Sequence, residues 1–153
     1  MQNVANPGLV RPPVVYTLAV VAGLALEAVW PVGLPLGRAG PLLAGVFGVV
    51  AVLLVVWTRR VFKAANTPVP GNRPAVAVVT SGPFRLSRNP LYLAFTALGL
   101  SVAVFAGSAW AIGTVVLAVG VMQWVVIPRE ERYMTQRFRD EYVAYMSSVR
   151  RWL

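Results

Sequence analysis

The chain alternates between long apolar runs and shorter polar connections. Four runs of about 16 to 20 residues cover roughly 14–30, 41–57, 91–106 and 109–127. Each run is near the length that crosses ~30 Å of hydrocarbon as a helix, and the third is the shortest. The pattern predicts an all-α membrane protein, a single integral-membrane domain over 1–153 whose four transmembrane helices form two hairpins.

Two polar segments complete the predicted architecture. The connection over 58–90 can extend the second helix to about Ala65, where Pro68 and Pro70 stop it, and its valine-rich stretch 76–79 predicts extended backbone. A connection of this length in a compact membrane protein favours an ordered, functional segment. After the fourth run, apolar residues recur every three or four positions, which predicts one amphipathic helix over 129–152 that begins near Pro128.

Basic residues are distributed unevenly, and the net charge is +9. They concentrate in the connection 58–90 and in the tail after the fourth run, whereas the other two connections carry a single arginine, Arg38. The positive-inside rule then places both termini and the long connection in the cytoplasm of a multi-pass protein of the cell membrane. The arginines flank membrane helices and form no separate basic domain, so we expect the lipid bilayer as partner and no nucleic acid. No small-residue cleavage site follows the first run, so we expect that helix to be retained.

Composition narrows the possible chemistry. Hydrophobic residues make up 58% of the chain and charged residues 12%, and the chain contains no cysteine and no histidine. Disulfides, cysteine-rich zinc sites, cysteine nucleophiles and histidine bases are therefore excluded, and we expect no metal site. Any chemistry must come from acids, tyrosine, arginine, asparagine, backbone groups or a cofactor.

The segment 81–92 is the first candidate site. Arg85 and Arg88 precede Asn89-Pro90, a rigid entry to the third helix, and Tyr92 falls in the first helical turn. Guanidinium groups beside a helix N-terminus favour a carboxylate or phosphate. Anchoring to lipid headgroups is the alternative for both arginines.

Three acids are the other candidates. Glu130 lies in line with the apolar face of the tail and should point inward, whereas Glu131 is rotated by about 100°. Alternatively, both are helix-start acids paired with Arg129 and Arg132. Glu27 is the acid inside an apolar run, so it is either functional or snorkels to the interface near Trp30.

Several short motifs carry a family resemblance. They are Thr80-Ser81-Gly82-Pro83-Phe84, Arg88-Asn89-Pro90-Leu91-Tyr92, the pair Glu130-Glu131, Phe138-Arg139-Asp140-Glu141-Tyr142-Val143-Ala144-Tyr145, and the closing Val149-Arg150-Arg151. In order and spacing, the chain resembles the isoprenylcysteine carboxyl methyltransferase family and the related phospholipid N-methyltransferases. It departs from the first family at Phe84, Asn89 and Arg139, which stand for tyrosine, histidine and glycine. Val126 stands where eukaryotic members carry an arginine on the substrate side, which argues against a prenylcysteine carboxylate as acceptor.

The resemblance implies a membrane methyltransferase that depends on S-adenosyl-L-methionine and holds this cofactor in a cytoplasmic pocket. It implies catalytic roles for Glu130, Arg88 and Tyr92. The residues expected to bind the cofactor are Val76, Ala77, Val78, Val79, Phe84, Arg85, Asn89, Pro90, Leu91, Tyr92, Glu130 and Glu131. Acids suit the amine and ribose hydroxyls of the cofactor, and aromatic faces suit its sulfonium and adenine.

The expected reaction is in-line methyl transfer to sulfur, oxygen or nitrogen of a lipophilic small molecule or lipid, which depends mainly on alignment. Two alternatives stay open. One is an NADPH-dependent, sterol-reductase-like oxidoreductase, and the other is a non-catalytic membrane protein.

Overall fold

The computed structural model describes residues 11–68 and 74–153. Within these ranges the regular structure is helical, and the β-type pairing is one isolated bridge between Gly33 and Ser108. The elements are the helices α1 (Pro12–Val29), α2 (Ala39–Ala64), α3 (Pro90–Phe105), α4 (Ala109–Val121), α5 (Ile127–Phe138) and α6 (Asp140–Ser148), with a 3₁₀ turn η1 (Gly82–Arg85) and a π-helical turn η2 (Met122–Val126).

The distribution of side chains fits helices surrounded by lipid. Three helices are long and apolar enough to cross a membrane, namely α1, α2 and the continuous helix Ala109–Phe138, while α3 is shorter at 16 residues. Large apolar side chains such as Leu42, Leu117 and Trp124 are exposed. The interior is rich in alanine, which lets helices approach closely; the buried alanines of the long helices are Ala44, Ala51, Ala94, Ala97, Ala103, Ala111 and Ala118. The protein is a multi-pass helical membrane protein.

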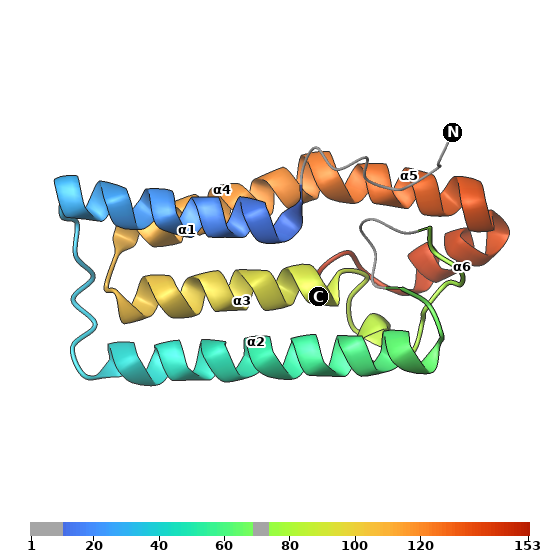
Figure 1. Ribbon diagram of the computed structural model, residues 1–153, viewed down its shortest axis with the longest axis horizontal. Helices are drawn as coiled ribbons and strands as arrows, with labels where there is room; N and C mark the ends of the chain where they lie inside the picture. The colour runs from blue at the N-terminus through green and yellow to red at the C-terminus, as the bar shows by residue number, and fades with distance from the viewer. Residues whose placement is uncertain (1–10, 69–73) are drawn as a thin grey trace.

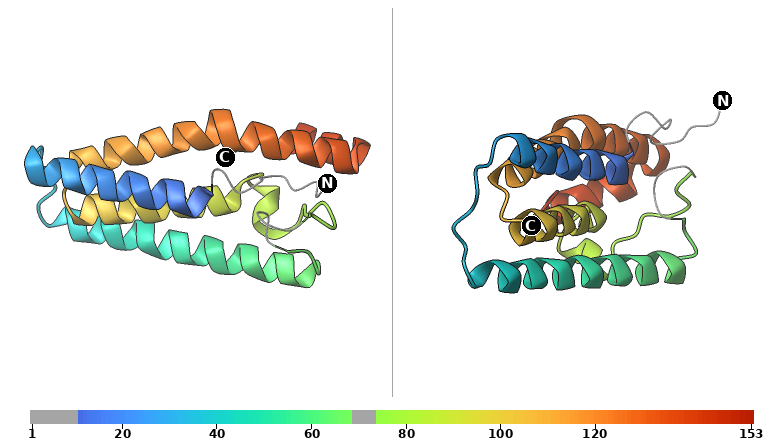
Figure 2. Two further views of the ribbon diagram at one scale, coloured as in Figure 1. Left: turned by 45° about the horizontal axis from the view of Figure 1, so that its top comes forward. Right: turned by 60° about the vertical axis from the view of Figure 1, so that its left-hand side comes forward.

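The long helices lie side by side along the long axis of the molecule, with α3 between α1 and α2 (Figures 1 and 2). Helix α1 packs mainly against α4, and α2 packs mainly against α3. Helices α3 and α4, which follow each other in the chain, contact each other. The first expected hairpin does not form a packed pair, because the connection over 30–38 steps across α3 to reach α2.

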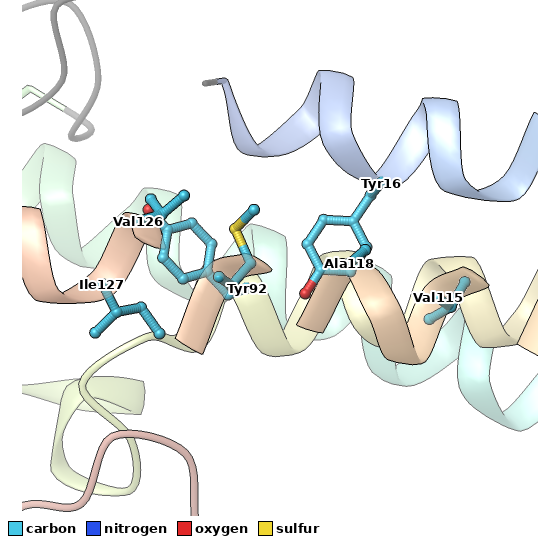
Figure 3. Packing of buried hydrophobic residues seen from close by; sticks show 7 residues of the cluster. Tyr16, Tyr92, Val115, Ala118, Val126 and Ile127 are labelled. Carbon is cyan, nitrogen blue, oxygen red and sulfur yellow. The ribbon is translucent and has the colours of Figure 1, made fainter. Parts of the chain in front are cut away.

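A buried cluster joins α1, α3 and the α4–α5 helix (Figure 3). Its members include Tyr16, Tyr92, Met122 and Ile127. The hydroxyl of Tyr16 hydrogen-bonds to Thr96 Oγ1 at 2.8 Å. The cluster therefore fixes the start of α3, where Tyr92 lies, against the helix that carries the two acids.

Glu27 has a structural role at the opposite end of the molecule. Its Oε1 accepts a hydrogen bond from the backbone N–H of Val32 at 2.7 Å, and its Oε2 accepts one from Ser108 Oγ at 2.8 Å. The Ser108 hydroxyl also accepts from the N–H of Ala111 and so caps α4. The carboxylate thus ties the α1–α2 connection to the α3–α4 turn.

Pro128 does not separate the fourth membrane helix from the tail, contrary to expectation. Proline has no N–H to donate, and its ring crowds the carbonyl four residues earlier. The helix accommodates Pro128 by widening into the π turn η2, in which the N–H of Ile127 bonds to the carbonyl of Met122. The helix therefore continues from Ala109 to Phe138, and it carries Glu130 and Glu131 well beyond the apolar run.

The expected single helix over 129–152 is instead two helices. The chain breaks at Arg139, whose φ of 47° and ψ of −120° lie in a region that favours glycine. Beyond this residue α6 folds back along the end of α5 (Figure 1). The apolar positions 134, 138, 142 and 145 still share one cluster, but they reach it from two helices.

Replacing Arg139 with glycine is expected to stabilise the protein. A positive φ strains a non-glycine residue by about 1–3 kcal/mol, and glycine relieves this strain. Glycine also makes the unfolded chain more flexible, which lowers the stability of the folded protein by roughly 0.4–1 kcal/mol. We therefore expect a gain of about 1 kcal/mol, visible as a melting temperature higher by roughly 3 °C. Arg132→Gly, at an exposed position inside α5, is the matched control and should lower the melting temperature. Equal effects of the two substitutions would contradict this account of the break.

Candidate functional site

A pocket opens where the end of α2, the connection after it, and α5 and α6 meet. Its wall combines aromatic, apolar and charged side chains, and this composition is typical of sites for small molecules. The described residues that line it are Phe62, Thr67, Pro68, Ala75, Ala77, Val78, Val79, Phe84, Arg88, Asn89, Ile127, Glu130, Glu131, Tyr133, Met134, Tyr142 and Tyr145.

Glu130 is one of the charged residues that line the pocket. Its Oε1 accepts a hydrogen bond of 2.6 Å from the hydroxyl of Tyr92, which is 8% exposed. Tyr92 itself belongs to the neighbouring buried cluster and stands behind the carboxylate. One carboxylate oxygen is therefore fixed by α3, and a carboxylate with one fixed oxygen retains capacity to accept from a ligand.

Glu131 joins two distant parts of the chain. Its Oε1 and Oε2 accept from Nε and Nη2 of Arg151 at 3.0 and 2.6 Å, in a bidentate pair. Arg88 Nη1 lies 3.2 Å from the same Oε1. The partners are thus Arg88 and Arg151, and the alternative pairing of Glu131 with Arg129 and Arg132 is not formed. Hydrogen bonding to Glu131 raises the pKa of Arg151, as expected when a bond is made to the charged form.

The wall retains unused hydrogen-bonding groups. In the part of the chain that the structure describes, the buried atoms Arg88 Nε and Tyr133 Oη have no hydrogen-bond partner, and Thr58 Oγ1 in α2 is a third such atom. Both Arg88 and Tyr133 line the pocket. Buried polar groups are normally satisfied, so these two donors indicate a place for a polar ligand.

Aromatic rings form a further part of the wall. Phe84 packs edge-on against Phe62 with ring centroids 5.2 Å apart. The hydroxyl of Tyr145 donates to the carbonyl of Phe84 at 2.8 Å, and this bond holds η1 against α6. Burial raises the pKa of Tyr142 to about 12, so its hydroxyl stays neutral at physiological pH. These four neutral aromatic rings thus line the pocket together with the charged groups.

The connection after α2 supplies the outer wall. Arg137 Nε donates to the carbonyl of Ala75 at 2.6 Å, which fixes this segment to α5. The N–H of Val76 donates to Thr67 Oγ1 at 3.2 Å. The described residues 74–80 form no helix or strand, and the chain bends at Ala77, so the prediction of extended backbone over 76–79 stays a prediction. Outward movement of this segment would break the bond between Arg137 and Ala75 but no helix.

The structure brings eight of the predicted site residues into the pocket wall, namely Ala77, Val78, Val79, Phe84, Arg88, Asn89, Glu130 and Glu131. The other predicted residues are absent from the described wall. Val76 and Arg85 are exposed, Pro90 is buried, Leu91 is half-buried, and Tyr92 supports Glu130 from behind.

Sequence reasoning did not name several wall residues as part of the site. Met134, Tyr142 and Tyr145 recur at helical spacing, so the sequence identified them as one apolar face of the tail. That face packs against Phe62 and Phe84, and its spacing was the signal that could have placed these residues at the site. Arg151 follows no periodic pattern, so only the folded chain shows its pairing with Glu131.

The cavity is small, at about 90 Å³. Pockets that hold drug-sized ligands are about 300–1,000 Å³. A ligand larger than a few water molecules therefore requires the wall to widen. Across the described residues, no group of three or more histidine, cysteine, aspartate or glutamate side chains is placed to hold a metal ion.

Comparisons with known proteins place these residues in a family. The model of the phospholipid methyltransferase family matches residues 40–141, which include η1, α3 and both acids of the pocket. An uncharacterized protein of Haemophilus influenzae is 35% identical over 63 residues, which are 41% of this chain and 100% of that protein. No solved structure matches the chain. With most of its helical region covered by the family model, this chain belongs to the phospholipid methyltransferase family.

Proposed function

We propose that the protein is an S-adenosyl-L-methionine-dependent methyltransferase that acts on a lipophilic small molecule or lipid at sulfur, oxygen or nitrogen. Membership of the family implies methyl transfer at a membrane. The observation that carries the cofactor assignment is the pocket wall, in which aromatic rings line the same cavity as Glu130 and as Arg88, whose buried Nε has no partner among the described residues.

The residues present fit the chemical groups of this cofactor. Its carboxylate suits the free N–H of Arg88, and its amine and ribose hydroxyls suit Glu130. Its adenine and sulfonium suit the aromatic faces of Phe84, Tyr142 and Tyr145. The unused hydroxyl of Tyr133 offers one more hydrogen bond. When bound, the cofactor supplies an electrophilic methyl group.

The protein's own contribution is binding, alignment and exclusion of water. Glu130 is fixed by Tyr92, and Glu131 by two arginines, so the polar groups are ordered before a ligand arrives. Ordered groups of this kind hold two reactants in line at low entropic cost. No proton needs to move if the acceptor arrives as a thiolate, carboxylate or free amine.

The charges around the pocket support an orientation in the cell membrane. Arg59, Arg60 and Lys63 are exposed at the end of α2 nearest the pocket, and Arg129 and Arg132 are exposed on α5. By the positive-inside rule, we place this end, and with it the pocket and both termini, in the cytoplasm. The apolar outer faces of the helices then contact the bilayer, from which the acceptor enters.

The decisive test is a titration of the purified protein, in lipid nanodiscs, with S-adenosylhomocysteine. We expect binding at micromolar affinity or tighter, which corresponds to about −8 kcal/mol or more. A parallel titration with NADPH should give no signal. Binding of NADPH without binding of S-adenosylhomocysteine would favour the oxidoreductase alternative, and binding of neither ligand would favour a non-catalytic membrane protein.

A further inference from the structure

The segment after α6 is fastened to the pocket through its backbone. The N–H of Arg88 donates to the carbonyl of Arg150 at 2.9 Å. Ser87 Oγ and Asn89 Nδ2 donate to the carbonyl of Arg151 at 3.0 and 2.9 Å. These bonds do not depend on the side chain of residue 150 or 151. They bring the Arg151 side chain to Glu131 from outside the pocket.

The Glu131 carboxylate is shared unequally by two arginines. Arg151 binds both of its oxygens, whereas Arg88 approaches only Oε1. The side chains of Arg88 and Glu131 are 12% and 13% exposed, and that of Arg151 is 34% exposed. The bidentate partner is therefore the outer arginine, and the inner arginine keeps its Nε–H unpaired.

We propose that Arg151 is a positioning residue that makes Arg88 available to the carboxylate of the bound ligand, an inference that rests on the proposed function. Without Arg151, the Glu131 carboxylate is free to turn and form the bidentate pair with Arg88, which is the favoured geometry for guanidinium and carboxylate. Arg88 Nε would then be occupied. The group formed by Arg88, Glu131 and Arg151 would also fall from one net positive charge to none.

The test compares two ligands that share the adenosine and the sulfur and differ at the amino-acid end, which carries the carboxylate and the amine. S-adenosylhomocysteine carries the amino-acid carboxylate, and 5′-methylthioadenosine lacks the whole amino-acid end. We expect Arg151→Gln to lower the affinity for S-adenosylhomocysteine about 10- to 100-fold, which is the effect of losing one charged hydrogen bond. Affinity for 5′-methylthioadenosine should stay within about twofold, because its contacts do not involve Arg88.

Arg150→Gln is the matched control, since Arg150 is the exposed neighbour and keeps its backbone bond to Arg88. It should change neither affinity. On the background of Glu131→Gln, Arg151→Gln should have no further effect, because the group that competes for Arg88 has already lost its charge. Arg151→Lys keeps the positive charge but cannot form the bidentate pair with Glu131, so it should cause an intermediate loss of affinity. This variant replaces Arg151→Gln in the test if the latter does not fold.

The two ligands distinguish failure of this inference from failure of the proposed function. If Arg151→Gln lowers the affinity for both ligands equally, Arg151 has a merely structural role, and if it lowers neither affinity, Arg151 has no role. Either result overturns the inference. If the unmodified protein binds neither ligand, the proposed function itself is wrong.

Discussion

Replacing Glu130 with glutamine is expected to weaken binding of S-adenosylhomocysteine by about 10- to 100-fold, because one charged hydrogen bond contributes about 1.5–3 kcal/mol. Glutamine keeps the shape of the side chain and can still accept the hydrogen bond from Tyr92. It removes the charge that the proposed site offers to the amine and ribose hydroxyls. Calorimetric titration of the variant measures the loss directly, and methyl transfer should fall at least in proportion.

The same substitution should leave the fold intact. Removal of a charge that is held in a buried site does not destabilise the protein by itself, so the melting temperature of Glu130→Gln should stay within a few degrees of the unmodified protein. Glu141→Gln changes an exposed acid of α6 and is the control for charge alone. Full affinity of the Glu130→Gln protein would contradict a role for the Glu130 charge in binding S-adenosylhomocysteine.

Replacing Gly23 with alanine is expected to cause the largest loss of stability. A Cβ at this position in α1 would overlap Ala111 Cα and stand 2.7 Å from the backbone nitrogen of Ala111 in α4. Backbone cannot turn aside as a side chain does, so the two helices must separate. We expect a cost near the upper end of overpacking effects, about 3 kcal/mol, and a melting temperature lower by roughly 10 °C.

Gly113→Ala is the matched control in the helix that faces Gly23, because a Cβ at Gly113 meets nothing within 4 Å. Alanine also favours helix more than glycine does, so this variant should be equal or slightly more stable. Thermal unfolding followed by circular dichroism in detergent distinguishes the two. If Gly23→Ala has the same melting temperature as the unmodified protein, α1 and α4 are not in close contact at Gly23 and Ala111.

The sequence predicted the helices well because their signals are local. The apolar runs and Pro90 determine where α1 to α4 lie, and the extension of α2 to Ala64 follows from the absence of a helix breaker before Pro68. The inward position of Glu130 followed from its spacing to Met134 along one helical face. These features depend on residues within one or two turns of each other.

The features that sequence reasoning missed depend on distant residues or on backbone geometry. Whether α1 packs on α2 or on α4 is decided by close contacts such as Gly23 with Ala111, which no local pattern records. Pro128 looked like a helix start, but the π turn before it absorbs the missing hydrogen bond. The break at Arg139 was visible only as a departure from the glycine of related proteins.

The narrow cavity has a consequence for the speed of binding. A cavity of about 90 Å³ is too small for a nucleoside-sized ligand, so the proposed cofactor requires a wider state of the wall, which we expect to open before the ligand enters. The observed affinity is then reduced by the fraction of molecules that are open. Association becomes slower than an encounter limited by diffusion and levels off at high ligand concentration, where opening sets the pace. We expect the 74–80 segment, a part of the wall that belongs to no helix, to set this rate.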